Sequence, residues 1–418
     1  MHALGPFMNL TRTRSRVQLA GCRNIGPFAV AATGLVAMAQ GVSLGRFVFT
    51  PMLPMMLSDG SLTLSEGGAL ATANYVGYLA GALLCLWVRT DAARMVRVAL
   101  VFAILLTVAM AIPGDLILWL AWRGLAGICC AFVMVFTTAW SQQRLAELGR
   151  PELAGMMFCG PGIGVILTSV PAIGMTAAHW PARLGWAAFS VLGIALILPV
   201  WRFLRSPSQS GPRNIESSVV DQVPKLRRKF TAEAWSLAVV FGLAGFGYII
   251  IATFLPVIAR RALPRSSLVD MFWPIFGVGV TVGAWVVTRI GIHHDNRRLL
   301  MAFYVVQATG IGTIVVWPTV PGFVLCSLLV GVPFLAITSI AMREARRLWP
   351  GDATRLIGLL TTSYATGQIA GPILATTLVA RTNGFGTSLC IAVAALLVGA
   401  FGCLAMLYVT PIRRRGIR

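Results

Sequence analysis

The stretch PFAVAATGLVAMAQGVSLGRFVFTPMLPMML, residues 27–57, is apolar along almost its whole length and carries a single charge, at Arg46. About 20 apolar residues suffice for a helix to cross the hydrocarbon core of a bilayer. A charged side chain at the centre of such a helix costs roughly 2.5–3.5 kcal/mol on insertion scales. Arg123 lies in a second apolar stretch, 116–139, which holds no acidic residue. We therefore interpret both arginines as functional, and holding an anion inside a membrane protein is their simplest use.

The composition of the whole chain is that of a membrane protein. Of its 418 residues, 57% are hydrophobic and 11% are charged, whereas a soluble domain is about 25% charged. Most of the cysteines lie in apolar segments, and no CxxC pair or Cys/His cluster is present. We therefore expect neither a disulfide framework nor a metal site, and no cofactor.

Apolar windows predict twelve transmembrane helices and hence an all-α membrane protein. Polar residues interrupt them most strongly at 205–232, which divides the helices into two groups of six. The predicted spans are 27–57, 66–88, 95–112, 116–139, 153–177 and 185–204 in the first half, and 235–259, 269–290, 298–317, 321–342, 355–380 and 386–409 in the second.

The formal net charge of +21 would by itself suggest a nucleic-acid partner. With a cytoplasmic N-terminus, however, the cytoplasmic segments hold about five times as many Lys and Arg as the outer loops, which is the positive-inside pattern. We expect both termini in the cytoplasm, an inner-membrane location and no nucleic acid. The expected organisation is a tail at 1–26, a six-helix bundle at 27–204, a basic linker at 205–232, a second six-helix bundle at 233–409 and a tail at 410–418.

The two halves repeat one another at a spacing of about 200 residues, a pattern found in many secondary transporters. The repeat superposes Gly45 on Gly247 and Leu53-Pro54 on Leu255-Pro256. Glycines and prolines set helix packing and kinks, so their recurrence indicates two pseudo-symmetric bundles. In this alignment Arg46 corresponds to Tyr248 and Arg123 to Ser327, which confines the buried positive charge to the first half.

The two groups of six spans, the basic linker and the repeat together resemble the major facilitator superfamily across essentially the whole chain. GVSLGRFVFTPMLP (41–54), NYVGYLAGA (74–82) and GFGYIIIATFLP (245–256) are similar to its YbfB/YjiJ branch, a group of bacterial transporters. The resemblance implies two six-helix bundles that rock around a central small-molecule site, with spans one, four, seven and ten lining it. It does not imply a particular cargo.

Two motifs of the superfamily are only partly present. The loop WVRTDAAR (87–94) keeps Asp91 and Arg94 of a motif that clamps the closed gate but lacks its glycines, so a reduced clamp and a solvated turn are both open. Span five contains Gly160, Pro161 and Gly164, similar to a Gly-Pro-rich motif of exporters and antiporters. Close helix packing with a kink is the preferred interpretation, and it leaves the direction of transport open.

The candidate substrate-binding residues are polar groups inside the spans. Arginine offers a planar fork of donors suited to carboxylate or phosphate. Arg46 could instead extend toward the outer headgroups, and Arg123 could instead cap backbone carbonyls or brace helix packing. The candidates are Arg46, Arg123, Tyr248, Asn74, Tyr78 and Gln368, with Tyr75, Thr253, Gln307 and Tyr364 as further polar residues.

All 13 acidic residues and all 4 histidines are expected in loops or at helix ends. A buried proton relay is therefore not visible, which leaves anion exchange, a proton carried by the cargo, or titration of a rim acid such as Glu66. The chain lacks the Gly-x-x-x-x-Gly-Lys-Ser/Thr loop of ATP-driven proteins.

The sequence thus predicts a monomeric secondary transporter of a small organic anion, held by buried arginines. An exporter of hydrophobic or drug-like compounds, with structural arginines, is the alternative. An enzyme is disfavoured because no base, nucleophile or metal cluster lies near the bilayer. A sensor is disfavoured because the chain has no soluble domain.

Overall fold

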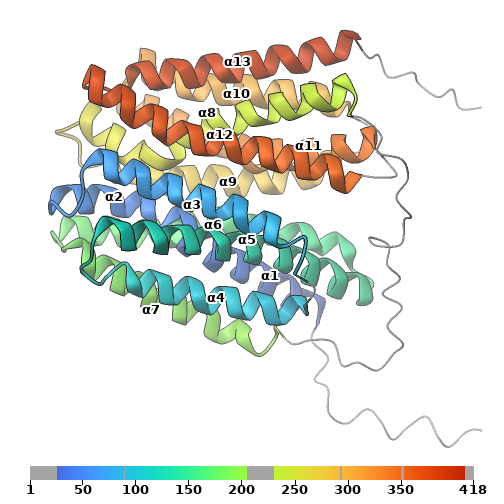
Figure 1. Cartoon of the computed structure of the whole chain (residues 1–418), viewed down its shortest axis with the longest axis horizontal. Helices are drawn as coiled ribbons and strands as arrows, with labels where there is room; N and C mark the ends of the chain where they lie inside the picture. Colours follow the sequence, from blue (N-terminus) through green and yellow to red (C-terminus); the bar gives the residue numbers. More distant parts are fainter. Residues whose placement is uncertain (1–25, 89, 205–229, 292–293, 350–352, 410–418) are drawn as a thin grey trace, which may run out of the picture.

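The computed structural model describes residues 26–88, 90–204, 230–291, 294–349 and 353–409. Every regular element in these ranges is helical. The helices form twelve rods that run side by side (Figure 1), which confirms the predicted all-α fold. Ten of the rods are both long enough and apolar enough to cross a membrane. The predicted tails and linker fall almost wholly outside the described residues.

The first half contains six rods, of which the first and fifth are each built from more than one helical element. The first rod is α1 (Pro27–Val42), η1 (Ser43–Phe47) and α2 (Phe49–Ser58), followed by α3 (Leu64–Leu84), α4 (Ala92–Ala109), α5 (Leu116–Glu147), then η2 (Pro151–Cys159) with α6 (Gly160–Ala177), and α7 (Ala182–Trp201).

The second half repeats this order after the linker. Its rods are α8 (Ala232–Ala262), η3 (Val269–Met271) with α9 (Phe272–Arg289), α10 (Asn296–Val316), α11 (Val320–Leu348), α12 (Ala353–Thr382) and α13 (Gly386–Val409).

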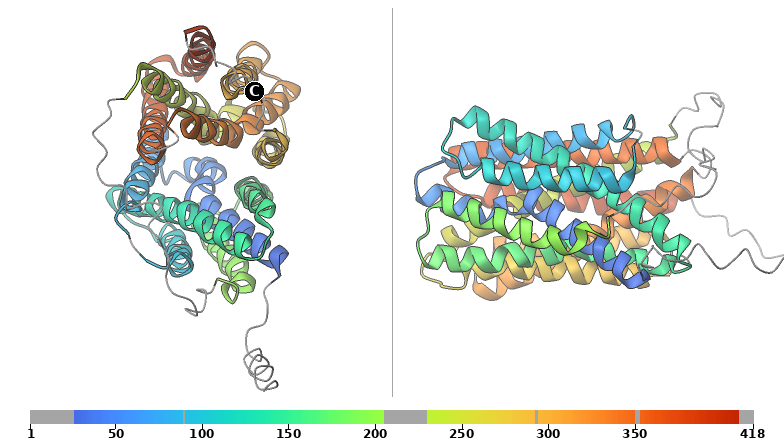
Figure 2. Two further views of the ribbon diagram at one scale, coloured as in Figure 1. Left: turned by 90° about the vertical axis from the view of Figure 1, so that its right-hand side faces the viewer. Right: turned by 90° about the horizontal axis from the view of Figure 1, so that it is seen from below.

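The most extensive contacts between the halves are those of α3 with α12 and of α6 with α9. Figure 2 shows the two groups of helices end-on, with these pairs at the edges of the boundary between them. The two rods that fall outside the apolar set, α3 and α12, pack on one another here. Because their partner is protein as well as lipid, they can carry more polar residues than a span surrounded by lipid.

Glycines of the repeat lie where helices cross closely. A Cβ at Gly81 would lie 2.9 Å from the carbonyl oxygen of Ile128, and one at Gly283, which the repeat superposes on Gly81, would meet the carbonyl oxygen of Val332 even more closely. These contacts join α3 to α5 and α9 to α11, which are equivalent pairs in the two halves. The sequence repeat therefore corresponds to a repeat of helix packing.

Gly160 and Gly164 let α6 pack closely on the first rod. A Cβ at Gly160 would lie 2.4 Å from the Leu35 carbonyl oxygen, and one at Gly164 would lie 2.4 Å from that of Ala39. Pro161 stands in the first turn of α6, where its missing N–H leaves no helical bond unmade. At this point the rod changes from the 3-10 turns of η2 to α-helix. This packing agrees with the preferred interpretation of the motif.

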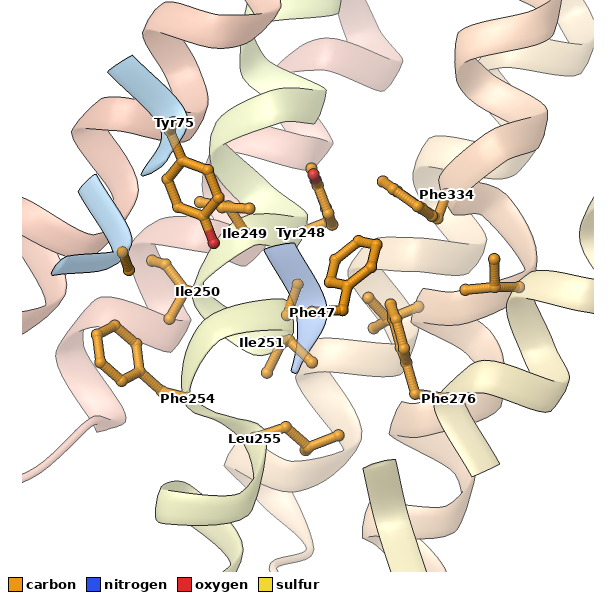
Figure 3. Packing of buried hydrophobic residues seen from close by; sticks show 14 of the residues in the cluster. Phe47, Tyr75, Tyr248, Ile249, Ile250, Ile251, Phe254, Leu255, Phe276 and Phe334 are labelled. Carbon is orange, nitrogen blue, oxygen red and sulfur yellow. The ribbon is translucent and has the colours of Figure 1, made fainter. Parts of the chain in front are cut away.

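We call the end of the bundle where α1 begins and α13 ends the terminal end, and the other the distal end. Side chains fill the centre of the distal half, where α2 packs against α8 of the other half. Figure 3 shows part of this core, with Phe47 of η1 among Tyr248, Phe276 and Phe334. Thr50 donates a hydrogen bond to the carbonyl oxygen of Ala252 at 2.7 Å. The two halves are therefore in contact on the distal side.

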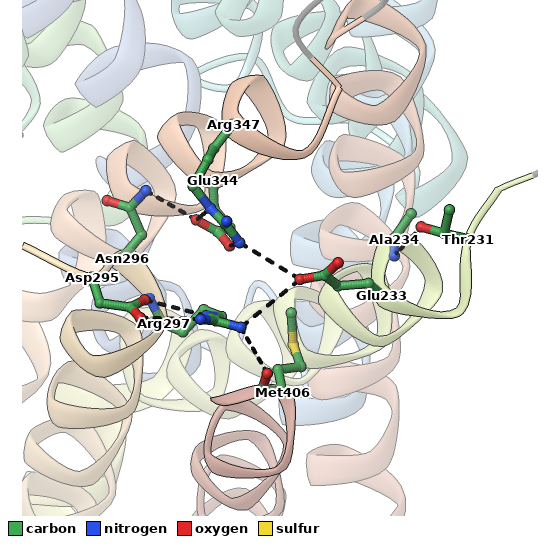
Figure 4. A network of polar contacts seen from close by, with 9 residues as sticks. All are labelled: Thr231, Glu233, Ala234, Asp295, Asn296, Arg297, Glu344, Arg347 and Met406. Atoms are coloured by element: carbon green, nitrogen blue, oxygen red, sulfur yellow. Dashed lines mark hydrogen bonds and ion pairs between the residues drawn. The ribbon is translucent and has the colours of Figure 1, made fainter. Parts of the chain in front are cut away.

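A network of charged groups ties the second half together at the terminal end (Figure 4). Arg297 of α10 is 1% exposed and contacts Asp295, Glu233 and the carbonyl oxygen of Met406. Arg347 of α11 reaches Glu233 and Glu344. The network joins α8, α10, α11 and α13 of one bundle.

Glu344 corrects one expectation from the sequence. Like all the acids it was expected in a loop or at a helix end, but α11 continues past the predicted span 321–342 to Leu348, and Glu344 is completely buried inside it. Asn296 donates a hydrogen bond to its carboxylate at 3.0 Å, and Arg347 pairs with it. In the first half, Asp91 caps α4 by accepting a hydrogen bond from the backbone N–H of Arg94 at 2.8 Å.

Candidate functional site

Arg46 lies in a π-helical turn in the middle of the first rod. The N–H of Val48 donates to the carbonyl oxygen of Ser43 at 2.7 Å, five residues back instead of four. Pro51, one turn further on, has no N–H to give to the carbonyl of Phe47. Single π turns are rare and frequently lie at functional sites.

The backbone of this turn is held by side chains from α3 and α5. Asn74 Nδ2 donates to the carbonyl oxygen of Gly45 at 2.8 Å and to that of Arg123 at 2.9 Å. Arg123 in turn donates from Nη2 to the carbonyl oxygen of Arg46 at 3.3 Å. The guanidinium of Arg123 also lies over the ring of Phe49, 4.8 Å from its centre. Asn74 and Arg123 are thus directed at the backbone around Arg46.

The Arg46 side chain crosses to the other half of the molecule. Its Nη2 donates to the hydroxyl of Tyr248 at 3.0 Å. The guanidinium lies over the rings of Tyr75 and Tyr78, 4.6 Å and 5.3 Å from their centres. Its Nε is buried and finds no hydrogen-bond acceptor among the described residues.

The two buried arginines have no carboxylate partner in the described part of the chain. The ion pairs there join loop or helix-end residues, and none includes Arg46 or Arg123. Arg46 is 7% exposed and Arg123 is 3% exposed. Two permanent cations are therefore buried next to each other without a carboxylate partner among the described residues, as the lack of acidic residues in their spans indicated.

Tyr248 connects Arg46 to a set of aromatic rings. Its hydroxyl also accepts a hydrogen bond from Gln368 Nε2. Its ring packs against Phe334, with centres 4.7 Å apart, and against Tyr364, with centres 5.8 Å apart. Phe241 stacks on Tyr364 at 4.5 Å. The aromatic wall, Phe241, Tyr248, Phe334 and Tyr364, belongs entirely to the second half.

A cavity of about 90 Å³ lies between Arg46 and this wall. Phe241 precedes Tyr248 on α8, and Thr338 follows Phe334 on α11, so both lie on the terminal side of the Arg46–Tyr248 pair. The cavity therefore extends from Arg46 toward the terminal end. The described residues that line it are Val42, Arg46, Phe47, Tyr78, Cys130, Met134, Pro161, Phe241, Phe334, Leu335, Thr338, Met342, Thr361, Tyr364 and Gln368.

The distal side of Arg46 is closed by contacts between the halves. The hydroxyls of Tyr75 and Thr253 are hydrogen-bonded at 2.8 Å. The ring of Phe47 packs edge-on against that of Trp273, with centres 6.0 Å apart. The site in this conformation thus faces the terminal end.

The structure sorts the sequence candidates into layers. Arg46, Tyr78, Gln368 and Tyr364 line the cavity, and Tyr248 contacts three of them, Arg46, Gln368 and Tyr364. Asn74 and Arg123 lie one layer behind. Gln307 lies elsewhere in the second half, where it donates to the carbonyl oxygen of Val330 at 3.3 Å. Their assignment to cargo binding stays a prediction.

Sequence reasoning missed the apolar residues of the cavity, such as Phe241, Phe334 and Met134. A phenylalanine in a spanning helix looks the same whether it faces lipid or cargo, so composition carries no signal for them. Their positions on the fourth, seventh and tenth spans were the one available pointer. No group of three or more His, Cys, Asp or Glu residues is gathered for a metal ion in the described part of the chain.

Comparison with known proteins places residues 37–404 in a family described as the uncharacterised MFS-type transporter YbfB. The cyanate transport protein CynX of Escherichia coli (strain K12) is 26% identical over 269 residues, which is 62% of this chain and 66% of that protein. An uncharacterized MFS-type transporter of Yersinia pestis (strain Pestoides F) is 23% identical over 345 residues, covering 80% of this chain and 85% of that protein. A crystal structure of a mutant of the nucleoside transporter NupG shares the fold, with a TM-score of 0.71 at 14% identity over 90% of this chain and 99% of that one.

Proposed function

This chain belongs to the YbfB family of MFS-type transporters, and we propose that it is a secondary active transporter whose cargo is a small organic anion. Arg46 carries the proposal. It is a permanent cation, almost completely buried, that faces a cavity between the two halves and has no carboxylate partner among the described residues. An anionic cargo would supply the missing charge.

The energetic argument concerns the cost of burying a cation. A guanidinium keeps its proton in proteins, so it cannot lower this cost by becoming neutral. The faces of Tyr75 and Tyr78 compensate in part through cation–π attraction. A carboxylate would add charge-assisted hydrogen bonds to the same group. Binding of an anionic cargo therefore lowers the free-energy cost of burying the Arg46 guanidinium, which is highest when the site is empty.

The proposed transport cycle follows from contacts that join the halves. Opening the distal side requires breaking the bonds Arg46–Tyr248, Thr50–Ala252 and Tyr75–Thr253. When Arg46 loses the Tyr248 hydroxyl, a carboxylate on the guanidinium would take its place. Bound anion would thus favour rocking of the two halves, while an empty site would retain the contact with Tyr248.

The orientation that we propose puts the terminal end in the cytoplasm of a bacterial inner membrane. The excess of Lys and Arg in the segments assigned to that side supports it. The cavity would then face the cytoplasm in this conformation. Since Arg46 is the one charged residue among the described residues that line the cavity, we further propose coupling by anion exchange or by a proton carried on the cargo. The relative named as a cyanate transport protein supports an anion, because cyanate is one.

The alternative, an exporter of hydrophobic or drug-like compounds, draws support from the same cavity. Most of its lining is apolar or aromatic. In that case Arg46 would serve only to hold the halves together through Tyr248. The two functions differ in what happens when the charge is removed.

Transport into proteoliposomes distinguishes them. Purified wild-type protein, Arg46→Gln and Arg381→Gln are tested with organic anions and with neutral compounds of similar size. Arg381 is exposed at the distal end of α12, so its substitution removes a charge without touching the cavity. We expect at least a tenfold loss of anion transport in Arg46→Gln and none in Arg381→Gln. Unchanged transport of every anion by Arg46→Gln would exclude the proposed function.

A further inference from the structure

The lining of the cavity also indicates what kind of anion fits. We propose that the cargo is a monocarboxylate whose single charged group binds Arg46 and whose flat apolar body lies against the aromatic wall. This inference rests on the proposed function and adds the charge and shape of the cargo.

The charge follows from the number of cations at the cavity. Among the described residues that line it, Arg46 alone is charged. Arg123 is the second buried cation, but it does not line the cavity, and its guanidinium is directed at the Arg46 carbonyl and the Phe49 ring. One positive group balances one negative group. Apart from Arg46 the described lining is neutral, mostly aromatic and aliphatic with Thr338, Thr361 and Gln368, so a second carboxylate would be buried there without a counter-charge, which is costly.

The planar shape of the cargo's head group is inferred from the Arg46 donors that remain available. Nη2 already donates to Tyr248, while Nε is buried and without an acceptor among the described residues. A planar carboxylate can accept two parallel hydrogen bonds from one guanidinium. The rings of Tyr75 and Tyr78 cover the guanidinium. The approach left to the anion is therefore in the plane of the guanidinium, which suits a planar head group.

The body follows from the aromatic wall. The ring pairs Phe241–Tyr364 and Tyr248–Phe334 have centres 4.5 Å and 4.7 Å apart, and the stacking of Tyr248 on Tyr364 at 5.8 Å joins them into one packed group. Leu335 and Met134 complete an apolar rim. Aromatic groups pack well on such a surface in offset or edge-on arrangements. A body that is flat and apolar gains more there than a hydrated or polyhydroxylated one.

The test uses four probes with purified full-length protein in detergent at neutral pH, and measures the shift in melting temperature with concentration. Benzoate has one carboxylate and a ring, phthalate has two carboxylates and a ring, benzamide has the ring without charge, and acetate has the charge without a ring. We expect benzoate to bind most tightly, and each of the other three at least tenfold more weakly.

Each contrary ranking has a distinct meaning. Phthalate binding as tightly as benzoate overturns the single charge, and acetate binding as tightly overturns the apolar body; both leave anion transport standing. Benzamide binding as tightly as benzoate, with both unchanged in Arg46→Gln, overturns the proposed function itself. Absence of any shift with benzoate at about 10 mM, while a different anion stabilises the protein, overturns this inference alone.

A pair of variants tests the wall separately from the charge. Phe334→Leu removes a ring that packs on Tyr248, whereas Phe401→Leu removes a ring that is 68% exposed on α13. We expect Phe334→Leu to lower the preference for benzoate over acetate by at least threefold, with acetate affinity unchanged. Phe401→Leu should leave the preference as in wild type. Equal preference in wild type and Phe334→Leu contradicts the assignment of the body to this wall.

Discussion

Arg123 donates a hydrogen bond from its guanidinium to the backbone carbonyl oxygen of Arg46, 3.3 Å away, so one buried arginine holds the backbone of the other. The two residues look equivalent in the sequence, since each is an isolated cation in an apolar span. In the structure Arg46 lines the cavity and Arg123 lies behind it. The predictions below separate the two positions.

Arg123→Gln should cost stability, and Arg46→Gln should not. Loss of the Arg123 guanidinium leaves the Arg46 carbonyl oxygen without this donor in a buried turn, which costs about 1–3 kcal/mol. Loss of the Arg46 guanidinium instead leaves its acceptor, the Tyr248 hydroxyl, with the hydrogen bond from Gln368, so this loss leaves no buried acceptor unpaired. Unfolding in detergent, measured by circular dichroism without cargo, compares them. A larger loss of stability in Arg46→Gln would contradict the roles assigned here.

Arg46→Lys should bind an anionic cargo at least tenfold more weakly than wild type. Lysine keeps the positive charge but offers a point charge in place of a planar fork. Because lysine keeps the positive charge, Arg46→Lys should still bind the anionic cargo more tightly than Arg46→Gln does. Isothermal titration of the three proteins with one carboxylate probe gives the order. Equal affinity of Arg46→Lys and wild type would mean that the fork is not used.

Asn74→Ala should lower both stability and cargo affinity. Asn74 serves two carbonyl groups, those of Gly45 and Arg123, and leaving buried acceptors unpaired costs about 1–3 kcal/mol. The π turn should then lose its fixed geometry, and Arg46 with it. Gln307→Ala is the matched control, because Gln307 also donates to a backbone carbonyl but lies away from the cavity. Both variants should melt earlier, and only Asn74→Ala should change the dissociation constant.

Much of the fold could be predicted because each rod is a long apolar segment and the repeat fixes which helices are equivalent. The alignment superposed Arg46 on Tyr248, and in the structure these two residues are hydrogen-bonded to each other across the halves. The π turn could not be predicted, because it depends on donors from α3 and α5 that are far away in the sequence. The burial of Glu344 was missed because a charge past an apolar window looks like the start of a loop.

The charged network at the terminal end gives a prediction for acid pH. Burial acts to raise the pKa of the Asp295 carboxyl, but the hydrogen bonds from Arg297 outweigh it, so this pKa lies below its ordinary value. A lowered pKa stabilises the folded state above the unfolded pKa, about 3.9, and this contribution is lost as pH falls through the folded pKa. Titration of Asp295 should therefore leave the melting temperature unchanged between about pH 8 and 5.

Asp295→Asn tests this directly. The variant should be less stable than wild type at neutral pH, and the difference should shrink as the pH falls below about 4. Melting curves of both proteins across this range provide the measurement. A difference that grows on acidification would mean that Asp295 does not hold Arg297 as a carboxylate.

The π turn also has a consequence for how the first rod is encoded. A π turn is an α-helix with one additional residue, and one residue corresponds to about 100° of rotation around the axis. Before the turn, the main contacts of α1 are with helices of its own half, whereas after it the main contact of α2 is with α8 of the other half. The additional residue thus rotates α2 relative to α1. The packing side of the first rod therefore faces its own bundle before the turn and the other bundle after it. Deleting Gly45 would restore the α-helical register without removing a side chain from the rod. Arg46 would then keep its contacts with only one of the two halves, either Tyr75 and Tyr78 or Tyr248.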